Sequence, residues 1–528
     1  MREPKLNALQ RIENSTWDLL IIGGGITGAG VFREASRLDL KILLVEQNDF
    51  ASGTSSRSSK LVHGGLRYLK QANLALTRES VVERERLLRE APGLVESLGF
   101  LMPIYDDKGP GKVAMTAALS LYSLLSGRKQ HEYFKKSEFL KILPNVDPRN
   151  LKGGFRFYDA QVDDTRLVMR TLREAKIENP ESLALNYVCA RKIGRNADGD
   201  VDSVTLEDSE TGVRKTIKVS AVVNATGSWA EHLHPSPEKN LHIRPLRGSH
   251  MIFPAELFPI DEAVSIIHPR DSRPVFVLPW ESAIMLGTTD VDHTKKLFDE
   301  PFISVEEVDY LMEGLRSVFP STRLTAQDCI ATFAGVRPVL SKGAADPSRE
   351  SRDHVLWVDK GLVTTTGGKL TTFRSVAVEA LKKTIEFLPA DEVLDGSIFE
   401  SLGDLEVSTH GLSESQLQRL LGRYGQDTKE LLEMAGKDDL TEIPGTAFLW
   451  AELPYAAKHE RIRHLGDLLL RRVRIGLLTA NGGEEFLPRV QKLCQGVLDW
   501  DTPKWEQEIA DYKVFWKMAH GLPEGVMP

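Results

Sequence analysis

The chain has 528 residues, 41% of them hydrophobic and 27% charged, and a formal net charge of −8. A chain of this length exceeds a single hydrophobic core, so we expect two or three domains. The negative charge argues against general nucleic-acid binding, and the N-terminal stretch MREPKLNALQRIEN lacks the apolar run of a secretory signal. The three cysteines, Cys189, Cys329 and Cys494, are widely separated, so we expect structural thiols in a reducing, cytoplasmic environment and no metal site.

A dinucleotide-binding pattern extends over residues 18–46. Its apolar strand, Leu19 to Ile22, leads directly into the glycine motif GGGITG at residues 23–28, and a helical run follows. In this motif Gly23 permits a tight turn, Gly25 lets the backbone approach a pyrophosphate, and Gly28 lets helix and strand pack closely. The pattern therefore predicts a diphosphate bound at the positive end of the helix.

The second apolar strand of this pattern, Ile42 to Val45, ends on Glu46. A carboxylate about 20 residues beyond the glycines is placed to accept hydrogen bonds from ribose hydroxyls. The same carboxylate would repel the 2′-phosphate of NADP. The motif alone leaves FAD and NAD both open.

The loop at residues 51–69, ASGTSSRSSKLVHGGLRYL, favours FAD. Hydroxyls and cations arranged in this way donate to several phosphate oxygens. Chemistry on a nicotinamide usually needs a separate substrate domain nearby, whereas here the loop follows the second strand directly. Cofactor contacts are therefore expected from Thr54, Ser55, Ser56, Ser59 and Lys60.

An uncharged run at residues 113–126, VAMTAALSLYSLLS, is flanked by Lys108, Lys112, Arg128 and Lys129. At about 14 residues it is too short to span a bilayer. Two interpretations remain open: a helix in the membrane interface with its basic flanks on anionic headgroups, and a buried helix of the substrate domain. A second run, residues 458–474, predicts an amphipathic helix docked on its own domain.

The rest of the chain indicates interleaved domains. VSAVVNATG (219–227) is another apolar strand entering a turn, and TTTGGKLTTFR (364–374) places glycines before a helical pattern. These two segments and the first motif can contact the same nucleotide only if the segments between them form an inserted domain. In that inserted domain, alternating apolar and polar residues indicate a mainly antiparallel sheet. We therefore assign residues 1–84, 151–239 and 336–389 to a FAD-binding domain, 85–150 and 240–335 to a substrate-binding domain, and 390–528 to a helical C-terminal domain. The C-terminal domain contains a capping box, Ser413 with Gln416.

A series of motifs follows GGGITG in a definite order: SSRSSKLVHGGLRYL, VVNATGSWA (222–230), RPLRGSHMIFP (244–254), LGTTD (286–290), AGVRPVL (334–340), SRDH (351–354) and TTTGGKLTTFR (364–374). Together they resemble the FAD-dependent glycerol-3-phosphate dehydrogenases of the quinone-linked, aerobic type. The resemblance covers residues of about 15 to 385 and is weaker beyond residue 400, where HLGDLLLRRVRIG (464–476) resembles a helix of the family's C-terminal cap domain. It implies an α/β fold in which a FAD-binding Rossmann-like domain is interleaved with a mainly antiparallel β substrate domain, followed by the helical C-terminal cap domain.

The resemblance implies that sn-glycerol 3-phosphate is oxidised to dihydroxyacetone phosphate. Hydride would leave C2 for flavin N5 while a base takes the C2 hydroxyl proton. Arg337 and Arg352 are expected to hold the phosphate, because the planar guanidinium gives bidentate contacts. Arg67 and Tyr68 are expected to orient the glycerol end or the flavin edge.

Two histidines lie in glycine-bearing motifs, and imidazole titrates near neutrality. We expect His250 to be the base and His63 to position the reactants. Lys369 is expected beside the flavin N1–C2=O, where negative charge develops, and it completes the catalytic set with Arg337. Further cofactor contacts are expected from Gly227, Gly368 and Thr371.

The resemblance also implies a membrane quinone as electron acceptor and peripheral contact with the inner face of the cytoplasmic membrane; we also expect a homodimer. Three alternatives remain: an oxidase that uses O₂ and releases H₂O₂, another amine- or amino-acid-oxidase-like flavoprotein, and a flavin-binding scaffold without catalysis. Amino-acid substrates carry a carboxylate that one arginine can hold, whereas two arginines and a lysine favour a phosphate.

Overall fold

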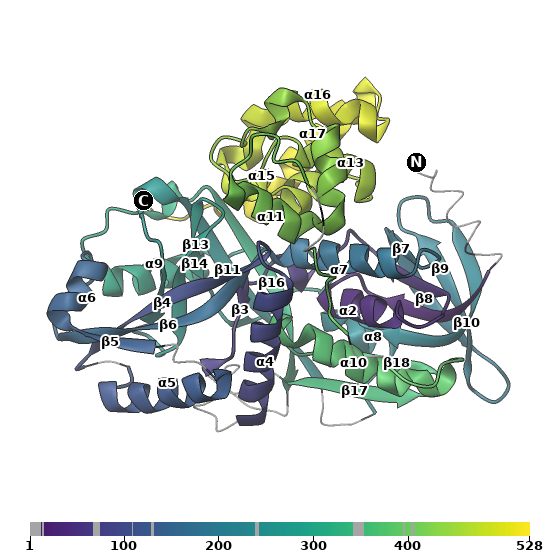
Figure 1. The fold of residues 1–528 in the computed structure, drawn as a ribbon, viewed down its shortest axis with the longest axis horizontal. Helices are drawn as coiled ribbons and strands as arrows, with labels where there is room; N and C mark the ends of the chain where they lie inside the picture. The colour runs from purple at the N-terminus through teal and green to yellow at the C-terminus, as the bar shows by residue number, and fades with distance from the viewer. Residues whose placement is uncertain are drawn as a thin grey trace.

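The computed structural model describes residue 12 and residues 15–527, apart from 67–73, 108, 128–130, 238–241, 342–352, 394–395, 403–404 and 406. Arg67, Tyr68 and Arg352 of the expected site lie outside the described residues, as do Lys108, Arg128 and Lys129 of the expected basic flanks. Two sheets and a helical C-terminal domain make up the described part, and the C-terminal domain lies across the other two (Figure 1). The predicted fold class is confirmed.

The first sheet carries the glycine motif. Its strands are ordered β17-β18-β10-β1-β2-β7, with β9 paired to β10 and β8 paired to β9, and the five from β18 to β7 run parallel. Their bounds are β1 (Thr16–Ile22), β2 (Ile42–Glu46), β7 (Leu183–Asn186), β8 (Val188–Arg195), β9 (Val201–Asp208), β10 (Arg214–Asn224), β17 (His354–Asp359) and β18 (Leu362–Gly367).

Both faces of strand β1 are buried, as expected for a parallel strand. Leu19 and Ile21 pack in one hydrophobic cluster with helices α2 (Ile26–Ala35), α7 (Asp164–Glu178) and α10 (Phe373–Thr384). Leu20 and Ile22 pack on the opposite face against strands β8 and β9. The alternation of side chains along the strand thus joins the two layers that hold the glycine motif in place.

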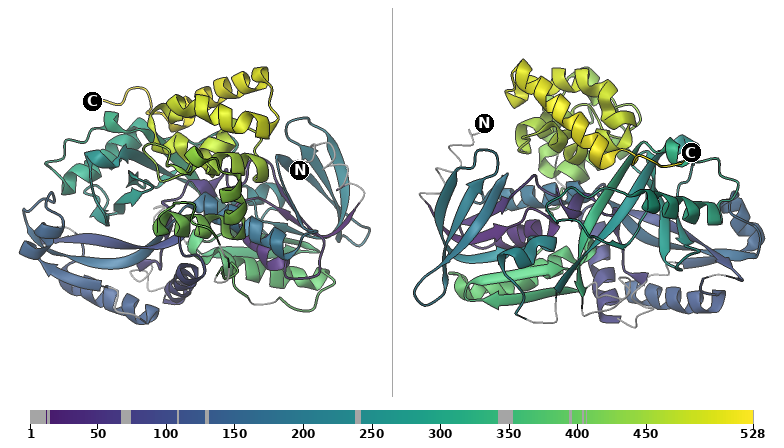
Figure 2. Two further views of the ribbon diagram at one scale, coloured as in Figure 1. Left: turned by 45° about the horizontal axis from the view of Figure 1, so that its top comes forward. Right: turned by 180° about the vertical axis from the view of Figure 1, so that it is seen from behind.

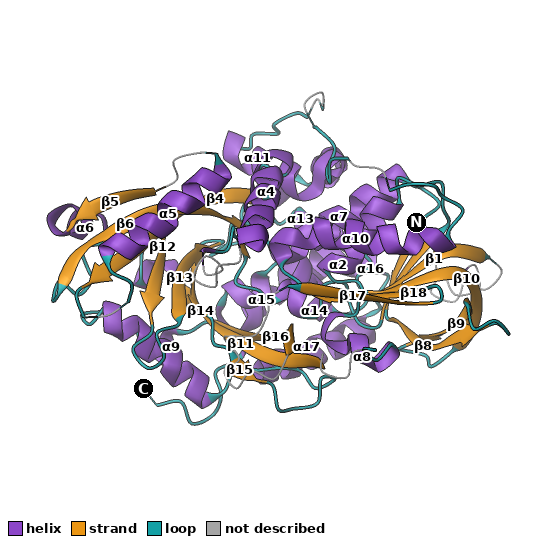
Figure 3. Ribbon diagram, turned by 90° about the horizontal axis from the view of Figure 1, so that it is seen from below, coloured by secondary structure: helices purple, strands orange, loops and turns teal. Residues whose placement is uncertain are grey.

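The second sheet is antiparallel except where β12 runs parallel to β4. Its strands are β3 (Leu61–Val62), β4 (Val95–Tyr105), β5 (His131–Lys135), β6 (Leu151–Val162), β11 (His242–Pro254), β12 (Ala263–Ile267), β13 (Pro274–Trp280), β14 (Ala283–Gly287), β15 (Val291–Asp292) and β16 (Ala331–Ser341). The helices beside it are α4 (Leu74–Glu90), α5 (Lys112–Ser126), α6 (Lys136–Ile142) and α9 (Val305–Val318) (Figure 3).

The structure differs from the expected domain boundaries at strands β3, β6 and β16. Strand β6 pairs with β4 along almost its whole length, from Val162 opposite Val95 to Leu151 opposite Tyr105, and β3 pairs with the end of β6. Strand β16 pairs with β11 as far as Ser341. These segments therefore belong to the second sheet, because backbone pairing with distant strands, which the local pattern does not encode, decides their place.

The C-terminal domain consists of short helices. They are α11 (Glu414–Tyr424), α12 (Thr428–Met434), α13 (Glu452–His459), α14 (Leu465–Asp467), the π-helical turn η10 (Leu468–Arg472), α15 (Ile475–Leu478), α16 (Leu487–Leu498) and α17 (Thr502–His520). The predicted capping box of Ser413 and Gln416 is confirmed at the start of α11. The run at residues 458–474 is broken into several short pieces. Its arginines 471, 472 and 474 are buried rather than exposed around a leucine stripe, and they pair with Asp49, beyond β2, and with Asp164 at the start of α7.

The remaining elements are short. They are α8 (Ala230–Leu233) and the turns η1 (Thr54–Ser56), η2 (Gly227–Trp229), η3 (Ala255–Leu257), η4 (Ala326–Asp328), η6 (Leu370–Thr372), η7 (Ile385–Phe387), η8 (Gly425–Asp427), η9 (Lys437–Leu440) and η11 (Ala480–Phe486).

Helix α5, which contains residues 113–126, buries one face and exposes the other. Met115, Leu119 and Tyr122 are buried on its inner face, whereas Val113 and Leu124 are 85% and 76% exposed. The helix lies on the side of the molecule away from the C-terminal domain (Figures 1 and 2). No helix within the described residues is long and apolar enough to cross a membrane.

Candidate functional site

A cavity of about 1160 Å³ begins at the glycine motif of the first sheet and reaches the second sheet. Most of the expected cofactor residues line it: Gly23, Gly25, Glu46, Thr54, Ser55, Ser59, Gly227, Gly368, Lys369 and Thr371. His63 and Arg337 of the expected catalytic set line the same cavity. Segments from the N-terminal, central and late parts of the described chain therefore meet here.

The glycine motif is shaped as a diphosphate site requires. A Cβ on Gly28 would lie 1.9 Å from the carbonyl oxygen of Gly23, so only glycine lets helix α2 pack this closely on β1. Gly25 is the N-cap of α2 and has no side chain to satisfy the first turn. Among the described residues none accepts a hydrogen bond from the amides of Thr27 and Gly28, which leaves these donors for an anion.

Glu46 stabilises the backbone of the glycine motif. Its carboxylate accepts from the amide of Gly24 at 2.8 Å and from that of Asn48 at 2.9 Å, and it also lines the cavity. Burial raises the pKa of Glu46, against the lowering effect of these two amides. A carboxylate has room for further donors, so it fits the ribose role as well.

Some side chains of the serine loop line the cavity, and others are buried in the protein interior. Ser55 Oγ accepts from the amide of Ile26 at 2.9 Å, and Thr54 donates to the carbonyl of Val336 at 2.5 Å. Ser56 and Lys60, expected at the cofactor, do not line the cavity. The Lys60 ammonium donates to Ser56 O at 2.6 Å and to the Asp164 carboxylate at 2.8 Å, because a fully buried cation is stable only when it is paired.

The two candidate histidines occupy different environments. His63 lines the cavity, and its amide donates to Thr371 Oγ1 at 3.0 Å. Burial lowers the pKa of His63 to about 4, with Asp159 opposing the shift and Lys369, Arg84 and Arg337 adding to it. Its imidazole is therefore neutral near pH 7 and able to accept a proton.

His250 does not line the cavity. Its ring is fully buried, stacks on Phe333 with the ring centres 4.6 Å apart, and has Nε2 2.9 Å from Ser59 Oγ. Burial lowers the pKa of His250 well below its usual value, with Arg337 and Lys60 adding to the shift. His250 thus contacts the cavity lining through the Ser59 hydroxyl, whereas His63 lines the cavity directly.

A pair of arginines lies at the second-sheet end of the cavity. Arg337 contacts Thr288 Oγ1 at 2.9 Å and Asp290 at 3.4 Å, and Arg273 contacts the other oxygen of Asp290 at 2.7 Å. Both arginine side chains line the cavity and are partly exposed, at 27% and 21%. The buried Asp290 fixes the two guanidinium groups side by side, as an oxyanion with several acceptors requires.

The sequence analysis missed Arg273 and Asp290. Asp290 ends the LGTTD motif that was noted, but no motif marks Arg273. The available signal was indirect: Arg273 immediately precedes strand β13, which pairs with β14, and β14 pairs with the strand that carries RPLRGSH.

Lys369 enters the cavity from a glycine turn. Gly367 and Gly368 adopt φ of +84° and +75°, which turns the chain from strand β18 toward η6. The Lys369 ammonium donates to Ser80 Oγ at 2.5 Å, and burial lowers its pKa to about 8, with Glu79 and Asp353 opposing the shift. The group therefore remains a cation near pH 7.

Apolar side chains also line the cavity, and two of them belong to helix α5. These side chains, which the sequence analysis did not identify as lining the site, are Leu66, Phe100, Met102, Pro110, Met115 and Ala118. Met115 and Ala118 belong to α5 itself. The cavity thus joins a polar site, near His63 and Arg337, to the helix whose opposite face is exposed and apolar.

Comparison with known proteins places this geometry in a family. Residues 18–374 match the family of FAD dependent oxidoreductases, and residues 390–504 match the C-terminal domain of alpha-glycerophosphate oxidase. The chain is 34% identical to glycerol-3-phosphate dehydrogenase 2 of Mycobacterium tuberculosis over 96% of this chain and 89% of that protein. It is 32% identical to the aerobic glycerol-3-phosphate dehydrogenase of Staphylococcus aureus over 88% and 87% of the two chains.

Solved structures agree. A glycerol-3-phosphate dehydrogenase from Bacillus halodurans complexed with FAD has a TM-score of 0.78 and 26% identity, covering 98% of this chain and 97% of its own. L-alpha-glycerophosphate oxidase from Mycoplasma pneumoniae with FAD bound shares the fold, with a TM-score of 0.55 and 20% identity over 70% of this chain and 95% of its own. The chain belongs to the FAD dependent oxidoreductases and, among them, to the FAD-dependent glycerol-3-phosphate dehydrogenases and oxidases.

Proposed function

We propose that the protein oxidises sn-glycerol 3-phosphate to dihydroxyacetone phosphate and passes the two electrons to a membrane quinone. The observation that carries this proposal is the meeting of three features in one cavity: the glycine motif, a neutral histidine and a fixed pair of arginines. Bound FAD supplies the acceptor of the C2 hydride. The protein supplies binding, orientation and the movement of one proton.

The residues of the first sheet fit FAD. The amides at the start of α2 would hold the diphosphate, and Glu46 would accept hydrogen bonds from the ribose hydroxyls. Lys369 and Thr371, which line the cavity near His63, would hold the flavin ring. A cation there stabilises the negative charge that the reduced ring carries.

His63 is the base in this proposal. It lines the cavity, its imidazole is neutral near pH 7, and its main chain is held by Thr371. As hydride leaves C2 of the substrate, the ring accepts the proton of the C2 hydroxyl, and the C2–O bond becomes the carbonyl of the product.

Arg337 and Arg273 hold the phosphate. Asp290 orients both guanidinium groups, and its own charge is balanced by them, so the pair presents net positive charge to a dianion. This arrangement favours a phosphate over the carboxylate of an amino acid. The remaining sequence-based candidates, Arg67, Tyr68 and Arg352, are proposed as further substrate contacts.

The apolar part of the cavity lining supports a lipid-soluble acceptor. It includes Met115 and Ala118 of α5, while Val113 and Leu124 of the same helix are exposed. We place α5 in the interface of the cytoplasmic membrane, on its inner side. An oxidase that reduces O₂ is the second candidate, favoured by the match of residues 390–504 to a domain of alpha-glycerophosphate oxidase.

Anaerobic stopped-flow absorbance of the purified flavoprotein tests this function. Mixing with glycerol 3-phosphate should bleach the flavin band rapidly, and a second mix with quinone should restore it within turnover time. Fast recovery with O₂ instead would establish the oxidase. Bleaching by an amino acid but not by glycerol 3-phosphate would overturn the substrate assignment.

A further inference from the structure

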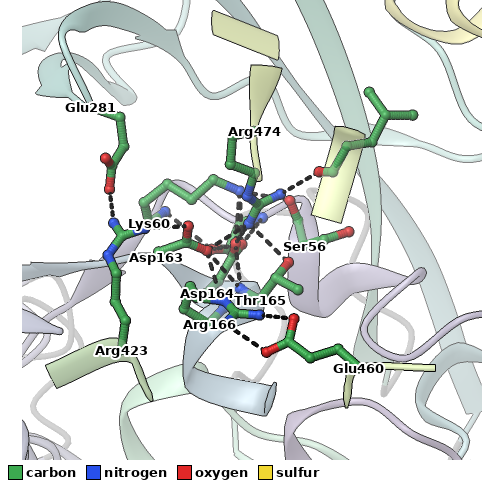
Figure 4. A network of polar contacts seen from close by, with 12 residues as sticks. Ser56, Lys60, Asp163, Asp164, Thr165, Arg166, Glu281, Arg423, Glu460 and Arg474 are labelled. Atoms are coloured by element: carbon green, nitrogen blue, oxygen red, sulfur yellow. Dashed lines mark hydrogen bonds and ion pairs between the residues drawn. The ribbon is translucent and has the colours of Figure 1, made fainter. Parts of the chain in front are cut away.

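One short segment of the C-terminal domain reaches into the cofactor domain. Arg474 is fully buried, and its Nη2 contacts Asp163 at 2.9 Å, Asp164 at 2.5 Å and Thr165 Oγ1 at 2.8 Å. Its other terminal nitrogen donates to the carbonyl of Leu470, which ties the guanidinium to its own domain. The contacted residues form the N-terminus of helix α7, and Figure 4 shows how they converge on this one side chain.

Asp164 also contacts the serine loop. Its Oδ2 accepts from both the amide and the hydroxyl of Ser58, at 3.1 and 2.7 Å, and from the Lys60 ammonium at 2.8 Å. Ser58 Oγ in turn accepts from the amide of Lys60 at 3.0 Å. One buried carboxylate therefore joins the C-terminal domain to residues 58–60.

Residues 58–60 border the cavity, and one of them has an unfavourable backbone conformation. Ser58 and Ser59 line it, and Ser59 contacts His250 at 2.9 Å. Lys60 adopts φ of +59°, a left-handed conformation that costs a non-glycine residue on the order of 1 kcal/mol and persists only where the surroundings impose it. The ammonium of Lys60, held by Asp164 and Ser56, provides that constraint.

We propose that Arg474 is a positioning residue: acting through Asp164, it holds residues 58–60 in the conformation that retains FAD, so the C-terminal domain helps to determine cofactor affinity. The inference rests on the proposed place of FAD in the cavity. It goes beyond the oxidation of glycerol 3-phosphate, because it assigns a cofactor-retaining role to a domain whose described residues contribute just Arg471 and Phe515 to the cavity wall.

The test compares full-length holoenzymes carrying Arg474→Gln and Arg166→Gln. Arg166 is the matched control, since it is equally buried and crosses the same domain boundary to Glu460, at 2.8 and 2.5 Å, without contacting Asp164 or residues 58–60 through its side chain. Both variants should lower the thermal midpoint, because each removes one arginine partner of a buried or nearly buried carboxylate. The rate of FAD release, followed by the rise of flavin fluorescence, should increase on the order of tenfold in Arg474→Gln only.

Two further variants make the result decisive. Ser58→Ala removes the hydroxyl contact between this loop and Asp164 while leaving the domain boundary intact, so it should speed FAD release without the loss of thermal midpoint. Arg474→Lys keeps the charge and should restore part of the slow release. Across these variants, any change in the flavin absorbance spectrum should correlate with the rate of FAD release and not with the thermal midpoint.

Equal release rates in Arg474→Gln and Arg166→Gln would overturn the proposal, as would wild-type release in Ser58→Ala. If Arg474→Gln fails to fold, Arg474→Lys replaces it: it should release FAD faster than Arg166→Gln, and equal rates would overturn the proposal. These measurements use no substrate, so they are independent of the bleaching experiment: failure of one leaves the result of the other standing.

Discussion

At the scale of single residues, burial separates side chains of the same chemistry. His63 and His250 both lie in glycine-bearing motifs, yet only His63 lines the cavity, while His250 stacks on Phe333 behind Ser59. Lys60 and Lys369 differ in the same way: one ammonium is enclosed with Asp164 and the other lines the cavity. Residue type identified the candidates, and their surroundings decide which can reach a ligand.

Replacing His63 with Asn should slow flavin reduction by glycerol 3-phosphate on the order of 10²–10⁴-fold, because the amide cannot accept the C2 proton. Stopped-flow absorbance at saturating substrate measures this rate. In the wild type the acid limb of the pH profile should follow the His63 pKa, which burial lowers to about 4, and this limb should vanish in the variant.

His250→Asn is the matched comparison. It removes one neutral hydrogen bond to Ser59, so the expected loss is less than about tenfold. A loss at His250 as large as that at His63 would return the role of base to His250.

At the scale of elements, α5 illustrates how one helix serves two environments. Its uncharged run is visible in the sequence, but the pattern does not say which face of the helix packs against the rest of the protein. In the structure Met115 and Ala118 line the cavity, and the exposed positions include Val113 and Leu124. The opposite end of the molecule offers its own exposed apolar pair on α17, Val514 and Met518, at 73% and 52% exposed.

Leu124→Glu should lower binding to phospholipid vesicles about tenfold or more, because a charge replaces an apolar side chain that the lipid would bury. Co-sedimentation with vesicles measures the bound fraction, and bleaching by glycerol 3-phosphate in solution should be unchanged. Val514→Glu is the control on the C-terminal domain. Loss of binding in Val514→Glu, with normal binding in Leu124→Glu, would place the membrane contact on the C-terminal domain instead.

At the scale of the whole molecule, buried and half-buried ion pairs join the domains. Arg471 and Arg472 both contact Asp49, at 2.6 and 2.7 Å, directly beyond the strand that ends in Glu46. Burial alone would raise the pKa of Asp49, but the two arginines lower it to about 2. Such pairs are costly to break once formed, because each partner would be left as an uncompensated charge.

A histidine forms a further link of this kind. His464 contacts Glu210, in the turn between β9 and β10, at 3.2 Å, and Glu508 on α17 at 3.0 Å. These two hydrogen bonds raise the pKa of His464 from 6.5 to about 10.

A raised folded-state pKa stabilises the fold at low pH. The contribution of His464 should be fully present below pH 6.5, decline as the pH rises, and be lost above pH 10. The difference in thermal midpoint between wild type and His464→Gln, measured across this range, should shrink accordingly. Glu210→Gln should reduce the same difference at low pH, and a difference independent of pH would contradict the role of the charged ring.

The sequence by itself determined the elements that local spacing encodes. The strand, glycine motif and Glu46 predicted a dinucleotide site, the ordered motifs indicated the family and FAD, and the capping box located the start of α11. These features depend on a few neighbouring residues, whose backbone requirements are the same wherever the segment lies.

Only the tertiary structure decided which distant side chains meet. Lys60 lies 104 residues from Asp164, and Arg474 lies 310 residues from it, yet all three share one buried cluster. The pairing of Arg273 with Arg337 across Asp290, the retreat of His250 behind Ser59 and the place of β6 in the second sheet arise in the same way. A local pattern fixes the backbone near a residue, but the direction and partner of its side chain depend on packing and charge neutralisation among segments that only the folded chain brings together.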